Sequence, residues 1–95
     1  MTDILTINDD TTPKFPKHVK FKYNEPRKEW ALLAPEKLVK PDPIAVEILQ
    51  LVDGERIVTE IAKELSKKFK APQDVILGDV KSMLQQLADK GFIIE

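Results

Sequence analysis

An apolar run from Trp30 to Ala34, closed by Pro35 and Glu36, constrains the fold of this chain more than any other feature. The run carries no charge before Glu36, and Pro35 would end a helix after little more than one turn. A short apolar run that begins with an aromatic residue is typical of a buried strand. We therefore expect a central strand here, with the rest of the chain packed around it.

The segments on both sides of this run predict two further strands. From His18 to Tyr23 polar and apolar residues alternate, which is the pattern of a half-exposed strand. Residues 24–28 are rich in turn-forming types and predict an antiparallel hairpin with the central strand. Residues 37–40 can form only a short third strand, and its lysines and the following Pro41 are features of a sheet edge.

Three helices are predicted after the strands. Asp42 and Pro43 form a helix start, because a capping carboxylate precedes a proline at the first helical position, and Asp53-Gly54 is a stop signal. A second helix is expected from about residue 58 and a third from about residue 72 to Gly91. The predicted fold class is α+β, winged-helix-like, with a three-stranded antiparallel sheet followed by a three-helix bundle.

Residues 1–16 are predicted to be a flexible tail in front of a single domain of residues 17–95. The tail is acidic around Asp9 and Asp10 and has neither a strand nor a helix period. Residues 4–7 are the only part that could pair as a strand, and the linker after them is long enough to let them reach the open sheet edge. There they would act as a weak internal competitor of a ligand.

The composition favours binding over catalysis. A chain of 95 residues has a small core, with little room for an enclosed cofactor or a deep active site. Its 15 Lys and Arg against 16 Asp and Glu give a net charge of −1, without the basic excess of nucleic-acid-binding proteins. Cysteine is absent, and the single His18 has no second catalytic or metal-binding group beside it. We expect no catalytic residue, no metal and no cofactor.

The sequence also bears on location and association. No apolar run approaches the ~18 residues that cross a bilayer, and the first residues lack the features of a signal peptide. We therefore expect a cytoplasmic protein that does not contact a membrane. A monomer is expected, although an exposed edge strand can also recruit a second copy.

Two binding functions remain open on these patterns. The free edge of residues 37–40 could receive an extended peptide by β-augmentation. The third helix has a wide apolar arc, which fits either a helix wedged between two neighbours or an open groove at Leu77 and Leu84 beside Lys81.

The alternative is a winged helix-turn-helix module that binds nucleic acid. Its reading face would combine lysines and glutamines of the third helix with two acidic residues. These are Lys81, Gln85, Gln86, Lys90, Asp79 and Asp89. The acidic residues and the lack of an Arg-rich helix argue against this alternative.

The Trp30–Glu36 run, the helix start at residues 42–49 and the segment from Asp79 to Phe92 closely resemble the PqqD family of pyrroloquinoline quinone biosynthesis proteins. The similarity extends from about residue 19 to the end of the chain. At Ile57 the family usually has Ser or Thr, so the side-chain cap of the second helix is lost and its first turn is expected to be less stable.

The resemblance implies a non-catalytic peptide chaperone. Such proteins bind a ribosomally made precursor peptide and present it to a radical S-adenosylmethionine enzyme, which joins a Glu and a Tyr of the peptide by a carbon–carbon bond. In that fold the peptide lies along the third strand and against the third helix. The implied peptide-binding residues are Leu38, Val39 and Lys40 of the third strand and Leu77, Val80, Lys81 and Leu84 of the third helix. The four helix residues are inferred from their helical phase.

Overall fold

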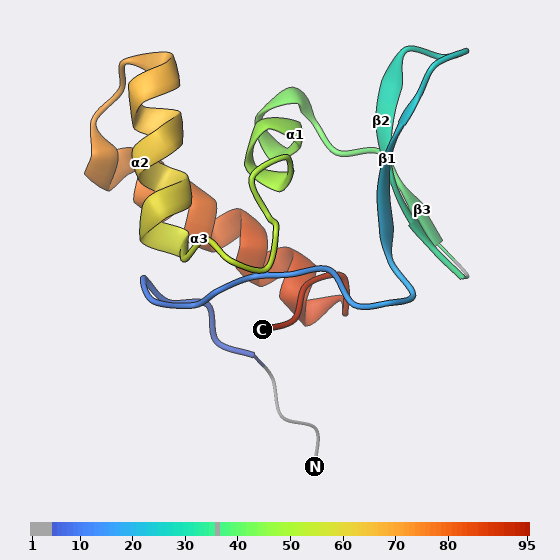
Figure 1. Cartoon of the computed structure of the whole chain (residues 1–95), viewed down its shortest axis with the longest axis horizontal. Helices are drawn as coiled ribbons and strands as arrows, with labels where there is room; N and C mark the ends of the chain where they lie inside the picture. Colours follow the sequence, from blue (N-terminus) through green and yellow to red (C-terminus); the bar gives the residue numbers. More distant parts are fainter. Residues whose placement is uncertain (1–4, 36) are drawn as a thin grey trace.

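Three antiparallel strands followed by three helices make up the fold (Figure 1), which confirms the predicted order. The computed structural model describes residues 5–35 and 37–95, so residues 1–4 of the expected tail and Glu36 lie outside the described part. The elements are β1 (Lys20–Asn24), β2 (Glu29–Ala34), β3 (Lys37–Val39), α1 (Pro43–Leu49), α2 (Val58–Phe69) and α3 (Gln73–Asp89). The sheet stands at one end of the molecule and α2 at the other, with α1 between them.

The predicted central strand is β2, which pairs with β1 on one side and β3 on the other. Leu32 lies opposite Phe21 of β1 and opposite Val39 of β3, and its side chain is completely buried. The next residue, Leu33, points to the other face and is 38% exposed. The run is therefore buried on one face only, because no helix covers the outer side of this antiparallel sheet.

The core lies among the helices and is completed by one face of the sheet. Helices α2 and α3 pack against each other, and α1 closes the side toward the sheet (Figure 1). The sheet side contributes Val19 and Leu32. The fully buried helix and C-terminal residues are Ile48, Leu49, Val58, Ile61, Ala62, Val80, Leu84, Phe92 and Ile93.

Helix α1 begins as the sequence predicts. The carboxylate of Asp42 accepts a hydrogen bond of 2.8 Å from the backbone N–H of Ala45, and Pro43 occupies the first helical position. The helix ends at Leu49, earlier than the predicted stop, and Leu51 and Val52 continue as a tighter turn. Gly54 adopts a φ of +78°, so the predicted stop residue instead forms the loop to α2.

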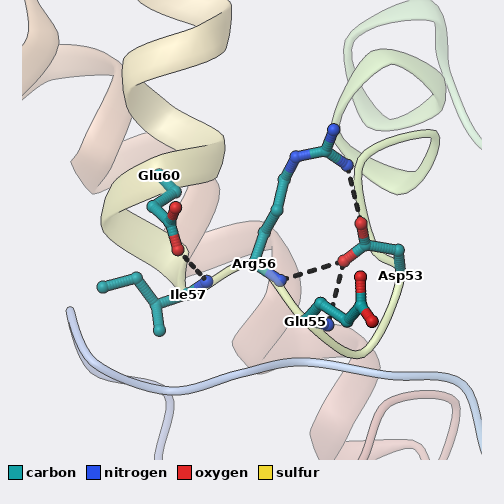
Figure 2. Close-up of polar contacts among 5 residues, drawn as sticks. All are labelled: Asp53, Glu55, Arg56, Ile57 and Glu60. Carbon is teal, nitrogen blue, oxygen red and sulfur yellow. Dashed lines mark hydrogen bonds and ion pairs between the residues drawn. The ribbon is translucent and has the colours of Figure 1, made fainter.

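A carboxylate organises this loop (Figure 2). Asp53 accepts hydrogen bonds from the backbone N–H groups of Arg56 (2.9 Å) and Glu55 (3.0 Å), and it forms an ion pair of 2.8 Å with the Arg56 guanidinium. The backbone N–H donors of Arg56 and Glu55, helped by the Arg56 charge, hold the pKa of Asp53 below its ordinary value of 3.8.

We expect Asp53→Ala to lower the thermal midpoint at pH 7, and we expect this effect to shrink as the pH falls below 3.8. A carboxylate whose pKa is lower in the folded state stabilises the fold above its unfolded pKa, and this stabilisation disappears as the pH falls through the folded pKa. Thermal melts of both proteins between pH 7 and pH 2.5 measure the effect, with Glu55→Ala as the neighbouring control. A difference that grows as the pH falls would contradict this role of Asp53.

Residues 5–16 pack on the helices, which differs from the expected flexible tail. The side chain of Ile7 is 7% exposed and that of Thr11 1%, and Pro13 and Pro16 are also buried. Figure 1 shows this segment, in blue, crossing α3 and passing beneath the first turn of α2. We call residues 5–16 the N-terminal strap.

The strap supplies the cap that α2 lacks. Ile57 has no capping side chain. The carboxylate of Glu60 accepts a hydrogen bond from the backbone N–H of Ile57, and no side chain of α2 caps the next two N–H groups (Figure 2). The backbone N–H groups of Val58 and Thr59 donate instead to the carbonyls of Thr11 (2.9 Å) and Asp9 (3.1 Å). Main-chain carbonyls from the strap thus replace the missing Ser or Thr at the start of this helix.

The other end of the strap is also held by main-chain bonds. Lys14 and Ile94 form an antiparallel bridge in which each N–H donates to the carbonyl of the other, at 2.8 and 2.9 Å. The strap therefore joins α2, α3 and the C-terminal segment into one packed unit.

Candidate functional site

The strand β3 is an edge of the sheet, as predicted. It pairs with β2 on one side only. Leu38 is 58% exposed on the outer face, Lys40 is exposed just beyond the strand, and Val39 is half-buried against the core. The free side of β3 therefore has main-chain donors and acceptors available to a fourth strand.

Two hollows border α3, one at the β2–β3 turn that precedes β3 and one at the start of α1 that follows it. The first has a volume of about 300 Å³ and lies between the β2–β3 turn and the end of α3. It is lined by His18, Ala34, Pro35, Lys37, Lys90, Gly91 and Phe92. The second has a volume of about 240 Å³ and lies between the start of α1 and the middle of α3. It is lined by Asp42, Ile44, Ala45, Ile48, Asp79, Ser82, Met83 and Gln86.

One face of α3 borders both hollows. The residues Asp79, Met83, Gln86 and Lys90 follow one another at spacings of four, three and four, so their side chains share one side of the helix. We call these four residues and Ser82 the β3 side of α3. An extended chain on the free edge of β3 would have this helix surface beside it.

A third hollow of about 200 Å³ continues the second one between the three helices. Ile44, Ile48 and Asp79 line both of them. Two of the apolar residues around it are well exposed, Ile44 at 70% and Phe69 at 51%. The remaining lining residues are Glu47, Leu65, Ile76 and Val80. This hollow can receive an aliphatic or aromatic side chain.

The lining charges differ in sign from one end of this row of hollows to the other. The first hollow is lined by Lys37 and Lys90, whereas Asp42 and Asp79 border the second and Glu47 the third. Opposite charges attract, so an extended ligand would place acidic groups toward the end of α3 and basic groups toward the start of α1.

The predicted α3 residues lie outside the β3 side of α3, and their part in peptide binding stays a prediction. Val80 lines the third hollow instead. Val80 and Leu84 have no exposed surface and belong to the core, and Leu77 is half-buried. Lys81 forms an ion pair of 2.9 Å with Asp9 of the strap. The wide apolar arc exists because α3 is wedged between α2 and other neighbours, which was the other interpretation of the same pattern.

Gln85 holds the strap on that opposite side of α3. Its side-chain oxygen accepts from the N–H of Ile7 and its nitrogen donates to the carbonyl of Leu5, both at 2.8 Å. Of the segment 4–7 that was expected to visit the sheet edge, residues 5–7 lie against α3 instead, and residue 4 lies outside the described residues. Lys81 and Gln85 of the alternative DNA-reading face are both engaged by the strap, and Gln86 lies on the other side of the helix.

The β3 side of α3 was missed by the sequence reasoning because its residues are mostly polar. Asp79, Ser82, Gln86 and Lys90 are exposed, and only Met83 belongs to the apolar arc. The one signal for this surface was that these residues share a helical phase at the edge of the arc, where Met83 belongs to both.

The described residues offer little for catalysis. His18 is exposed, and the hydroxyl of Ser66 donates to the carbonyl of Ala71. Residues 5–35 and 37–95 contain no group of three His, Cys, Asp or Glu side chains placed to hold a metal ion. No described helix is long and apolar enough to cross a membrane.

A family model described as coenzyme PQQ synthesis protein D (PqqD) matches residues 29–93. The chain belongs to the PqqD family. A relative from Bradyrhizobium diazoefficiens, named PqqA binding protein, is 48% identical over 96% of this chain and 88% of its own length. This agreement confirms the family that the Trp30–Glu36 run indicated.

Two solved structures share the fold of this PqqD protein. The solution structure of the PqqD part of Methylobacterium extorquens PqqCD, described as a functional stand-alone recognition element for ribosomally synthesized peptides, has a TM-score of 0.80 and 34% identity. The match covers 94% of this chain and 95% of the Methylobacterium chain. Lasso peptide synthetase B1, solved with a leader peptide, has a TM-score of 0.76 at 11% identity, with 90% of this chain and all of that one covered.

Proposed function

We propose that this PqqD protein is a non-catalytic chaperone that binds the PqqA precursor peptide as a fourth strand on β3. The observation that carries the proposal is the free edge of β3, with one hollow at the turn that precedes it and one at the start of α1 that follows it. The name of the Bradyrhizobium relative and the recognition role stated for the Methylobacterium structure support a peptide as the ligand.

Main-chain pairing would supply the first part of the binding energy. The backbone groups of Leu38, Val39 and Lys40 on the free side of β3 would bond to the peptide in the β-augmentation mode. Side chains of a bound strand alternate between two faces. Those on the inner face would lie against the β3 side of α3, where Met83 is the apolar contact, and an apolar side chain farther along could enter the third hollow.

Presentation to a second protein follows from this geometry. A peptide held on a sheet edge is covered on one side by the protein, and the rest of its surface stays open. The partner proposed from the family resemblance is a radical S-adenosylmethionine enzyme, which would act on the open part of the peptide. The chain itself would contribute binding and orientation and no reacting group.

Titration of the ¹⁵N-labelled protein with the precursor peptide tests the proposal. We expect amide shifts at residues 38–40 and at Asp79, Met83, Gln86 and Lys90, and small shifts at Lys81 and Gln85 on the strap side. The affinity should change little between roughly 50 and 200 mM salt, whereas a nucleic-acid complex with several phosphate contacts would weaken by orders of magnitude. Shifts confined to Lys81, Gln85 and the strap would contradict the proposed site.

A further inference from the structure

The two ends of this molecule carry opposite charge. Residues 17–40, which form the hairpin and β3, contain seven Lys and Arg and three Glu, a net charge of +4. The other residues contain eight Lys and Arg and thirteen Asp and Glu, a net charge of −5, and the two values add to −1 for the chain. The net charge of the whole chain is therefore close to zero although the sheet region is basic and the rest of the chain is acidic.

The outer face of the sheet has an apolar floor within this basic end. Ala31, Leu33 and Leu38 form the floor of a hollow of about 470 Å³ on the face that no helix covers. Leu33 and Leu38 lie directly opposite each other on neighbouring strands and are 38% and 58% exposed. We call these three residues, with the rim residues Lys22, Arg27, Glu29 and Lys40, the outer sheet face.

The rim of the outer sheet face is mainly cationic. Glu29 forms ion pairs with Lys40 (3.4 Å) and Arg27 (3.9 Å), which leaves the net charge of these rim residues positive. Lys22 lies opposite Ala31, and Lys20 lies opposite Leu33 on the same side of the sheet. Solvent-facing sides of antiparallel sheets are usually polar, and an apolar patch with a polar rim is typical of a protein interface.

We propose that the outer sheet face docks a folded protein whose surface presents an apolar side chain surrounded by carboxylates. The apolar floor favours a protein over a nucleic acid, because phosphate groups gain nothing from Leu33 and Leu38. This inference rests on the proposed function, and the partner that it names is the enzyme that receives the peptide.

Peptide and partner can be bound together at these two surfaces. The peptide would use the free backbone edge of β3 and the β3 side of α3, whereas Leu33 and Lys22 point to the opposite face of the sheet. If a peptide strand pairs with β3, every second side chain of the peptide would lie on the same side of the sheet as the outer sheet face. The partner would therefore contact the protein and the peptide on one continuous surface.

The test measures binding of the full-length protein to the radical S-adenosylmethionine enzyme of the pathway, with peptide binding measured in parallel. Leu33→Ser should weaken enzyme binding about tenfold or more, because it removes apolar contact area and buries a hydroxyl without a hydrogen-bond partner. Lys22→Glu should weaken it mainly through slower association, and more strongly at low salt. Lys63→Glu, on the exposed surface of α2, is the control and should leave the affinity unchanged.

Both outer-face variants should bind the precursor peptide within twofold of the unmodified protein, which separates this inference from the proposed function. Unchanged enzyme affinity in Lys22→Glu and Leu33→Ser would overturn the inference even when peptide binding is confirmed. If the two variants instead lose only binding to phosphatidylglycerol vesicles or to single-stranded DNA, the face serves a polyanion and the inference is also overturned.

Discussion

Deletion of residues 1–16 should remove most of the stability of this domain. The strap buries Ile7, Thr11, Pro13 and Pro16 and caps two N–H groups at the start of α2. Loss of a helix cap typically costs about 1 kcal/mol and loss of a buried large aliphatic side chain about 2–4 kcal/mol. These contributions sum to about 3–6 kcal/mol, which reaches the lower end of the roughly 5–15 kcal/mol that stabilises a small protein. We expect the truncated chain to be largely unfolded at 37 °C, which circular dichroism can show.

A single substitution in the strap gives a sharper measurement of the same contacts. Ile7→Ala should cost about 2–4 kcal/mol, which corresponds to a decrease in thermal midpoint of roughly 8–30 °C for a domain of this size. Thr6→Ala is the matched control, because the neighbouring Thr6 is exposed and should leave the midpoint almost unchanged. Equal midpoints for Ile7→Ala and the unmodified protein would mean that the strap is detached in solution.

The strap could not be predicted from sequence because its stabilising contacts are not periodic. Its buried residues occur at irregular spacings among acidic and polar neighbours, which is also the composition of a disordered segment. The contacts that hold it are long-range, such as the bonds of Gln85 to Leu5 and Ile7 and those of Asp9 and Thr11 to the start of α2. At this point of the chain the sequence showed only that α2 lacks a side-chain cap at Ile57.

The elements with local signals were predicted well. The alternation before Tyr23 and the apolar run after it fix two strands, and Asp42-Pro43 fixes the start of α1. The free edge of β3 followed from its shortness and its lysines. In contrast, the apolar arc of α3 did not identify an open surface, because a helix with neighbours on two sides needs a wide arc for packing alone. The candidate binding surface on α3 lies where the residues are polar, and polar residues on a helix have no distinctive pattern.

Proline at one of two positions in β3, Leu38 or Val39, should strongly weaken peptide binding without unfolding the domain. In an antiparallel pair, residues alternate between those whose N–H and C=O face the partner strand and those whose groups face away. Leu38 and Val39 are consecutive, so one of them directs its N–H to β2 and the other directs it to the free side. Proline removes this donor, and an edge strand tolerates proline where the N–H faces outward.

We therefore expect one of the variants Leu38→Pro and Val39→Pro to keep its far-ultraviolet dichroism and to bind the precursor peptide at least about tenfold more weakly, a loss of roughly 1.4 kcal/mol. The corresponding alanine variant keeps the N–H group and is the control, because its peptide affinity should change much less if the backbone forms the contact. Normal binding by the folded proline variant would place the peptide elsewhere. Unfolding of both proline variants would show that β3 has backbone partners on both sides, and the fourth strand proposed here would have no edge to join.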